Sequence, residues 1–129
     1  MARILIVEDN PDNMKLFRAL LALKGHTVTA LQSGDGLLEA LTQNQPELVL
    51  MDIQLPGKDG YALLQEIRGS PWAALRVVAL TAHAMSGDRE RAREAGFDDY
   101  ITKPIEISEF PEQVARALAG RTADTKEAD

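Results

Sequence analysis

The feature that most constrains the fold is a regular alternation between short runs of Ile, Val and Leu and longer stretches with helical spacing. The apolar runs are at residues 4–7, 27–30, 48–51, 77–80 and 100–102. Near-continuous apolar runs of this length are typical of strands buried on both faces of a parallel sheet, and the intervening stretches are long enough for crossover helices. The sequence therefore predicts an α/β fold with five parallel strands.

Five helices are predicted between and after these strands. They span about residues 10–24, 33–43, 59–68, 86–95 and 108–119. Asn10 is expected to be the N-cap of the first helix, with Pro11 in the first turn, where its missing N–H costs nothing. We expect the second helix to turn Leu37, Leu38 and Leu41 toward the core.

The first helix carries apolar residues on two sides. One stripe is Met14, Phe17 and Leu21, and the other is Leu16, Leu20 and Leu23. Either the helix is buried on both sides, or it covers the sheet and offers apolar surface to a partner protein. Residues 121–129 have no apolar periodicity, so we expect residues 1–120 to form one domain and residues 121–129 a flexible polar tail.

Composition and charge exclude several classes of protein. The chain has 129 residues, a net charge of −6 and a pI near 4.9, so it lacks the basic surface of nucleic-acid-binding proteins, and we expect no direct DNA binding. It has no cysteine, which excludes disulfides, thiolate metal sites and cysteine nucleophiles. No apolar run is long enough for a membrane span or a signal peptide. We therefore expect a cytoplasmic protein with no membrane association.

Polar residues that directly follow the apolar runs indicate a site. Glu8 and Asp9 follow the first run, Asp52 the third, Thr81 the fourth and Lys103 the fifth. In open α/β sheets the ligand crevice lies beyond the carboxyl ends of the strands, so these side chains should meet at one edge although they lie up to 95 positions apart. Each one alone has an ordinary alternative role as a helix cap or turn residue. Their convergence on one edge favours a functional site.

The chemistry of such a cluster favours a divalent cation. Three clustered carboxylates raise each other's pKa unless a cation neutralises them. Mg²⁺ or Mn²⁺ is the expected ion, since no cysteine and no well-placed histidine pair is available for zinc. Asp52 is then either a metal ligand or a nucleophile. Its attack on phosphorus would form an acyl phosphate, for which Lys103 supplies a second cation and Thr81 a hydrogen-bond donor.

Four motifs, ILIVEDN, LVLMDIQLPGKDG, VVALTAHA and YITKPI, resemble those of two-component response-regulator receiver domains. The spacings of 43, 29 and 22 residues between Asp9, Asp52, Thr81 and Lys103 match that family. The resemblance extends from residue 3 to about residue 119, and it implies a flavodoxin-like (βα)5 three-layer sandwich with strand order 2-1-3-4-5. The chain is most similar to single-domain regulators of the DivK or CheY type and to receivers attached to hybrid histidine kinases.

The resemblance also implies roles at the phosphoryl site. Asp52 would accept the phosphoryl group from a phosphohistidine on a histidine kinase or histidine phosphotransfer protein. Asp9 would bind Mg²⁺ directly, Glu8 through water or as a weaker ligand, and Gln54 through its backbone carbonyl, with Asp52 as a further ligand. Lys103 would pair with the Asp52 carboxylate before transfer and with the phosphoryl group afterwards.

A second set of implied roles concerns the conformational switch. Thr81 would move toward the phosphoryl group, Tyr100 would turn inward into the space released, and Ala82 would leave room for the phosphate. The peptide bond between Lys103 and Pro104 is expected to be cis, a conformation realistic only before proline. The face formed by residues 86–120 would bind the downstream protein target.

Two other classes of protein remain as alternatives. A Mg²⁺-dependent phosphatase with an aspartyl-phosphate intermediate uses a similar edge of acids, but it usually needs a general acid two residues past the nucleophile, where Gln54 stands. A pseudo-receiver would bind partners without phosphorylation, and the complete set of acids, Thr81 and Lys103 argues against it. We therefore expect a signalling switch with no attached output domain, and not a turnover enzyme.

Two features of the sequence each allow two interpretations. Arg89, Arg91 and Arg93 alternate with acids, and they form either a solvated helix face or a patch for a partner. His83 is either an exposed loop residue or, together with Gln54, a residue that tunes loss of the phosphoryl group.

Overall fold

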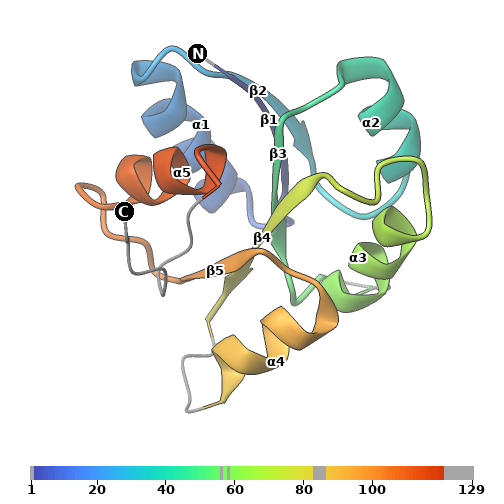
Figure 1. Cartoon of the computed structure of the whole chain (residues 1–129). Coiled ribbons are helices and arrows are strands. Elements are labelled where there is room, and N and C mark those ends of the chain that lie inside the picture. The colour runs from blue at the N-terminus through green and yellow to red at the C-terminus, as the bar shows by residue number, and fades with distance from the viewer. Residues whose placement is uncertain (1, 56, 58, 83–86, 121–129) are drawn as a thin grey trace.

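The computed structural model describes residues 2–55, 57, 59–82 and 87–120, and strands alternate with helices along the chain (Figure 1). The elements are β1 (Arg3–Val7), α1 (Pro11–Leu23), β2 (Thr27–Leu31), α2 (Leu37–Asn44), β3 (Leu48–Asp52), α3 (Gly60–Arg68), β4 (Arg76–Thr81), α4 (Asp88–Ala95), β5 (Asp99–Thr102) and α5 (Phe110–Leu118). The strands form one parallel sheet in the order β2-β1-β3-β4-β5. The predicted α/β class and strand order are confirmed.

Helices cover both faces of the sheet, as Figure 1 shows. On one face α1 and α5 meet through Phe17 and Phe110, whose rings stack with centroids 5.2 Å apart. On the other face the buried side chains of α2, α3 and α4 form a second cluster with those of the central strands. The middle strand β3 is buried at every position, which explains why its sequence is apolar without alternation until Asp52.

Two helices begin at residues whose side chains cap them, and the cap at Asn10 was predicted. The Asn10 side chain accepts the Asn13 N–H at 2.9 Å, and Pro11 occupies the first turn of α1. The Asp59 side chain accepts the Ala62 N–H at 2.9 Å at the start of α3. Both caps fix the helix that directly follows a loop at the carboxyl edge of the sheet.

The second helix differs from its prediction. It begins at Leu37 and not at Ser33, because the preceding residues form a turn in which Ser33 Oγ accepts the Asp35 N–H at 3.2 Å and Gly36 has a φ of 77°. A left-handed residue of this kind does not continue a helix. Leu38 lies on the outer side of α2 and is 38% exposed, so the prediction that it faces the core is wrong, whereas Leu37 and Leu41 are buried.

The last two helices also start later than predicted. The described part of α4 begins at Asp88, after Gly87 with a φ of 93°, and residues 83–86 lie outside the described residues. The fifth helix begins at Phe110 instead of Ser108, and Pro111 lies in its first turn, where proline is best tolerated.

The first helix buries one of its two apolar stripes. Met14, Phe17 and Leu21 are buried against the sheet, whereas Leu20 is partly buried and Leu23 is 82% exposed. Part of the second stripe is therefore at the surface. This helix has 13 residues, and no helix in the described part of the chain has the length and apolar character needed to cross a membrane.

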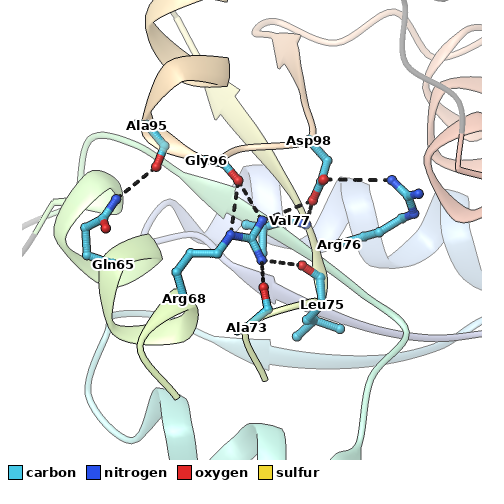
Figure 2. Close-up of polar contacts among 9 residues, drawn as sticks. All are labelled: Gln65, Arg68, Ala73, Leu75, Arg76, Val77, Ala95, Gly96 and Asp98. Atoms are coloured by element: carbon cyan, nitrogen blue, oxygen red, sulfur yellow. Dashed lines mark hydrogen bonds and ion pairs between the residues drawn. The ribbon is translucent and has the colours of Figure 1, made fainter. Parts of the chain in front are cut away.

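A single arginine joins several connections at the amino end of the sheet (Figure 2). Arg68, the last residue of α3, makes five hydrogen bonds of 2.6–3.2 Å, and its acceptors are the carbonyl oxygens of Ala73, Leu75 and Gly96 and the carboxylate of Asp98. Asp98 also accepts the Val77 N–H at 2.8 Å. A guanidinium has five N–H donors, so Arg68 is fully satisfied and binds the α3–β4 connection to the turn after α4.

Candidate functional site

The carboxyl ends of β1, β3, β4 and β5 bring the predicted site residues together. Asp52 is the last residue of β3 and lies beside Leu80 of β4, and Thr81 at the end of β4 lies beside Thr102. The backbone N–H of Lys103 donates to the Thr81 carbonyl at 2.7 Å, which places this lysine directly beyond the edge of the sheet. Strand register thus positions each side chain at the same edge.

Lys103 connects two carboxylates that are distant in sequence. Its Nζ lies 3.0 Å from Asp52 Oδ2 and 3.2 Å from Glu8 Oε1. Glu8 and Asp52 are 1% and 2% exposed, and Thr81 is 4% exposed. These three are the polar or charged residues that are buried within the described part of the chain. Buried carboxylates without partners are costly, so Lys103 is needed to hold both in place.

The remaining oxygens of the two carboxylates accept backbone N–H groups. Glu8 Oε2 accepts the Asn10 N–H at 3.1 Å, and Asp52 Oδ1 accepts the Gln54 N–H at 2.9 Å. Gly60 allows α3 to approach the loop after Asp52, because a Cβ at this position would lie 2.6 Å from the Asp52 carbonyl oxygen. The orientation of Asp52 therefore depends on the loop, on Lys103 and on a glycine in the next helix.

The electrostatics of the site leave it with excess negative charge. Burial raises the pKa of Glu8 above its ordinary value of 4.5, and the neighbouring charge of Asp52 raises it further, while the Asn10 N–H and Lys103 oppose the rise. For Lys103, burial lowers the pKa, but the hydrogen bonds and charges of Asp52 and Glu8 outweigh this effect and raise the pKa above 10.5. One protonated lysine thus faces more than one acid.

The acids fit a divalent cation of the magnesium type. Carboxylate oxygens of Glu8, Asp9 and Asp52 lie within 4.8 Å of one another, with Asp9 exposed at the mouth of the site. Mg²⁺ binds oxygens at about 2.1 Å, so opposite ligands are about 4.2 Å apart. Small side-chain movements would bring all three onto one ion. The donor set is made of oxygen alone, which suits a hard cation.

A cavity of about 350 Å³ lies at the carboxyl edge of the sheet, between α3 and α4. Thr81 and Tyr100 both line it, together with Gln54 and Tyr61. Tyr100 is already buried, with 9% of its surface exposed. The peptide bond between Lys103 and Pro104 is cis. Thr81 and Tyr100, the residues expected to sense a phosphoryl group, therefore share one cavity with Gln54, which lies two residues after Asp52.

Some residues predicted to belong to the site are exposed, and others lie outside the described part of the chain. Gln54 is exposed, and the contact of its backbone with Asp52 is made by the N–H. Ala82 is exposed directly after β4. Pro56, His83 and the tail at residues 121–129 lie outside the described residues. Interpretations that depend on them, and the roles assigned to the site residues, stay predictions.

Sequence reasoning missed two contacts between arginines and acids. Asp98 pairs with Arg68, and its neighbour Asp99 pairs with Arg89 at 3.2 Å. The one signal was the Asp98-Asp99 doublet directly before the last strand. A doublet before a strand does not identify its partners, because these come from α3 and α4, up to 30 positions earlier.

Comparison with known proteins identifies the family. Residues 4–115 match the sequence profile of the response regulator receiver domain. The chain belongs to this family. It is therefore a receiver domain of two-component signalling, as the motifs had predicted.

The relatives of this receiver domain include both short regulators and parts of kinases. It is 41% identical over 121 residues to the polar-differentiation response regulator DivK of Brucella ovis, which covers 89% of this chain and 94% of DivK. It is 40% identical over 120 residues to the sensor protein GacS of Pseudomonas syringae pv. syringae, covering 88% of this chain but 13% of GacS. The match to GacS thus concerns a small part of that protein.

Solved structures agree with the fold of the receiver domain. The receiver domain of a sensor histidine kinase from Pseudomonas aeruginosa, solved with a magnesium ion in its active-site cleft, is 35% identical with a TM-score of 0.81, covering 92% of this chain and 98% of that chain. The receiver domain of a histidine kinase from Syntrophus aciditrophicus is 31% identical with a TM-score of 0.81, covering 100% of this chain and 97% of that chain.

Proposed function

We propose that this receiver domain is a phosphorylatable switch in which Asp52 accepts a phosphoryl group from a phosphohistidine. The observation that carries the proposal is the contact between Asp52 and Lys103. A buried carboxylate at the carboxyl edge of the sheet is held 3.0 Å from a lysine, and two further acids lie beside it. This combination provides a nucleophile together with a cation already positioned for phosphoryl oxygens.

Mg²⁺ is the cofactor that we propose for this site. Glu8, Asp9 and Asp52 would hold it through carboxylate oxygens, and the Gln54 backbone carbonyl is proposed as a further ligand. When bound, Mg²⁺ neutralises charge on the acids and on phosphoryl oxygens. Support comes from the spacing of the carboxylates within 4.8 Å and from the magnesium ion in the structure of the Pseudomonas aeruginosa relative.

The transfer step that we propose forms one bond and breaks one. A carboxylate oxygen of Asp52 attacks the phosphorus of the phosphohistidine, the bond between phosphorus and the histidine nitrogen breaks, and an acyl phosphate forms on Asp52. The histidine nitrogen takes up a proton in place of the phosphoryl group. Lys103 then moves its hydrogen bond from the carboxylate to a phosphoryl oxygen, so the positive charge stays beside the developing negative charge.

The signal would arise from residues that contact the new phosphoryl group. The Thr81 hydroxyl is proposed to donate to a phosphoryl oxygen, with Tyr100 in the space next to it and Ala82 leaving room at the entrance. A group that binds the phosphorylated form better than the free form shifts the equilibrium between conformations. The face at residues 86–120 would transmit this shift to a downstream protein in the cytoplasm.

A histidine kinase or a histidine phosphotransfer protein is the proposed phosphoryl donor. Support comes from the family and from the similarity to GacS, a sensor protein. We propose a switch and not a turnover enzyme, because Gln54 occupies the position of the general acid that a phosphatase with an aspartyl-phosphate intermediate would need.

Incubation with acetyl phosphate and Mg²⁺, followed by intact mass measurement, tests the proposal. We expect a single phosphoryl adduct on the whole chain, and none on the Asp52→Asn variant. Asp35→Asn is the matched control, since Asp35 is an exposed acid in the turn before α2 and should leave the adduct in place.

Two outcomes would contradict the proposed function. No adduct on the wild-type chain, under conditions in which another receiver domain reacts, would refute phosphorylation at Asp52. Continuous release of phosphate from small phosphomonoesters would instead favour the phosphatase.

A further inference from the structure

The fourth helix has few apolar contacts with the rest of the molecule. Of its eight residues Asp88–Ala95, the buried one is Ala92. A helix that buries so little apolar surface depends on other contacts for its position. Two of its arginines lie over tyrosine rings: the guanidinium carbon of Arg89 is 4.4 Å from the ring centroid of Tyr100, and that of Arg91 is 5.5 Å from the ring centroid of Tyr61.

Asp99 fixes the position of Arg89. Its Oδ1 accepts from Arg89 Nη1 at 3.2 Å and from the backbone N–H of Tyr100 at 2.8 Å. Asp99 Oδ1 therefore links the Arg89 guanidinium to the backbone of Tyr100, and the same guanidinium lies over the Tyr100 ring. The Asp99 side chain is 13% exposed and that of Arg89 is 35% exposed, so the contact is partly shielded from water.

Tyr100 lines two cavities. A cavity of about 330 Å³ between α4 and α5 is lined by Arg89, Asp99 and Tyr100. The cavity of about 350 Å³ at the carboxyl edge of the sheet is lined by Tyr100 and Thr81. Tyr100 thus lines the cavity that contains Thr81 as well as the cavity between α4 and α5, and Arg89 lines the latter.

We infer that Arg89, positioned by Asp99, covers Tyr100 and holds its ring in the buried orientation next to Thr81. Arg89 is in this sense a positioning residue for the switch, because it acts through Tyr100, over whose ring its guanidinium lies. The inference rests on the proposed function in one respect: if the buried ring accompanies phosphorylation of Asp52, Arg89 favours the reactive conformation before any phosphoryl group arrives.

The other end of α4 is held independently of Arg89. Gln65 Nε2 donates to the Ala95 carbonyl at 2.9 Å, and Arg68 donates to the Gly96 carbonyl (Figure 2). These side chains of α3 satisfy the carbonyl groups that a helix leaves without partners at its C-terminus. Substitution of Arg89 should therefore release Tyr100 while α4 stays attached to the domain.

Fluorine NMR of the whole chain labelled with 3-fluorotyrosine tests the inference. The chain has 2 tyrosines, so two resonances are expected, and Tyr61→Phe and Tyr100→Phe assign them. The shift of each resonance between H₂O and D₂O reports how exposed its ring is. In Arg89→Ala we expect the Tyr100 resonance to move and to become sensitive to the solvent, with the Tyr61 resonance unchanged.

Arg91→Ala is the matched control. It removes the same charge from the same helix and a contact of the same kind, but over the other tyrosine. It should move the Tyr61 resonance and leave that of Tyr100 in place. Arg89→Lys, which retains the charge but not the planar guanidinium, should give a Tyr100 resonance between those of wild type and Arg89→Ala.

A kinetic measurement separates this inference from the proposed function. The adduct with acetyl phosphate and Mg²⁺ should form about 3- to 10-fold more slowly in Arg89→Ala, because the reactive conformation is less populated, and at the wild-type rate in the exposed control Asp35→Asn. An unchanged Tyr100 resonance in folded Arg89→Ala, or an unchanged adduct rate, would overturn the inference. A wild-type chain that forms no adduct would refute the proposed function, and the fluorine spectra would still decide whether Arg89 holds Tyr100.

Discussion

Replacement of Lys103 by methionine should destabilise the metal-free domain by about 2–3 kcal/mol near neutral pH. At an effective dielectric constant of about 20, each ion pair at 3 Å contributes about 5 kcal/mol of attraction. The cost of burying the lysine offsets much of this. The side chains of Asp52 and Glu8 are 4% and 0% exposed and that of Lys103 is 16% exposed, so water can replace the lysine only in part.

The destabilisation should depend on pH in a direction set by Glu8. A carboxyl group whose pKa is raised in the folded state contributes stability below its ordinary pKa of 4.5 and loses that contribution as the pH rises through the raised pKa. Without Lys103 the pKa of Glu8 rises further, since a neighbouring positive charge is lost. Lys103→Met should therefore cost more stability at about pH 7.5 than at about pH 5, where Glu8 can take up a proton.

Unfolding in urea with and without Mg²⁺ provides the assay. Trp72 is the one tryptophan of the chain and packs against the core, so its fluorescence reports unfolding. About 10 mM Mg²⁺ should stabilise Lys103→Met more than the wild type, because the ion no longer competes with the lysine for the acids. Lys15→Met, at an exposed position of α1, should change little at either pH. A loss of stability that is equal at both pH values, or no larger effect of Mg²⁺ on the variant, would refute the reasoning.

Two further substitutions test contacts that position the elements. Arg68→Ala leaves the carbonyl groups of Ala73, Leu75 and Gly96 without the arginine donor and removes one of the donors to Asp98, so it should cost about 3 kcal/mol of unfolding free energy. Arg76→Ala, whose guanidinium is 3.9 Å from Asp98, should cost less than about 1 kcal/mol in the same urea titration. Equal costs would contradict the role of Arg68. Gly60→Ala should lower the unfolding free energy by about 1–3 kcal/mol and slow formation of the adduct, because its Cβ would lie 2.6 Å from the Asp52 carbonyl oxygen. The control Gly69→Ala, whose Cβ would lie 3.4 Å from the nearest atom, should have neither effect. A similar effect of both substitutions would show that the close approach at Gly60 is not the cause.

The sequence predicted the parts of the fold that depend on local pattern. Runs such as Leu48–Asp52 are apolar without alternation because both faces of the strand are covered, and this property is visible in the sequence. The site was predictable for a related reason: Glu8, Asp52 and Thr81 each follow such a run, and parallel strands place their carboxyl ends on one edge. Their sequence positions alone were therefore enough to predict their proximity.

Features that depend on a side chain reaching a distant element were not predictable. The orientation of Leu38 was missed because α2 begins only after Gly36, which shifts the buried stripe. The contacts of Arg68 and Arg89 were missed because a long flexible side chain can reach acceptors on several elements. Helical periodicity indicates on which side of a helix an arginine lies, but not which carbonyl or carboxylate it meets.

The two charged clusters of the domain differ in how completely their charges and hydrogen-bonding groups are matched. Around Arg68 every N–H of the guanidinium has an acceptor, and one of these acceptors is the carboxylate of Asp98, so the guanidinium has no donor left for a ligand. At the carboxyl edge Glu8, Asp9 and Asp52 face one lysine, and the raised pKa of Glu8 reflects burial and the excess of acids. A buried cluster of unbalanced charges costs stability, and such clusters are concentrated at functional sites. The imbalance, more than the presence of charged residues, therefore marks this edge as the functional one.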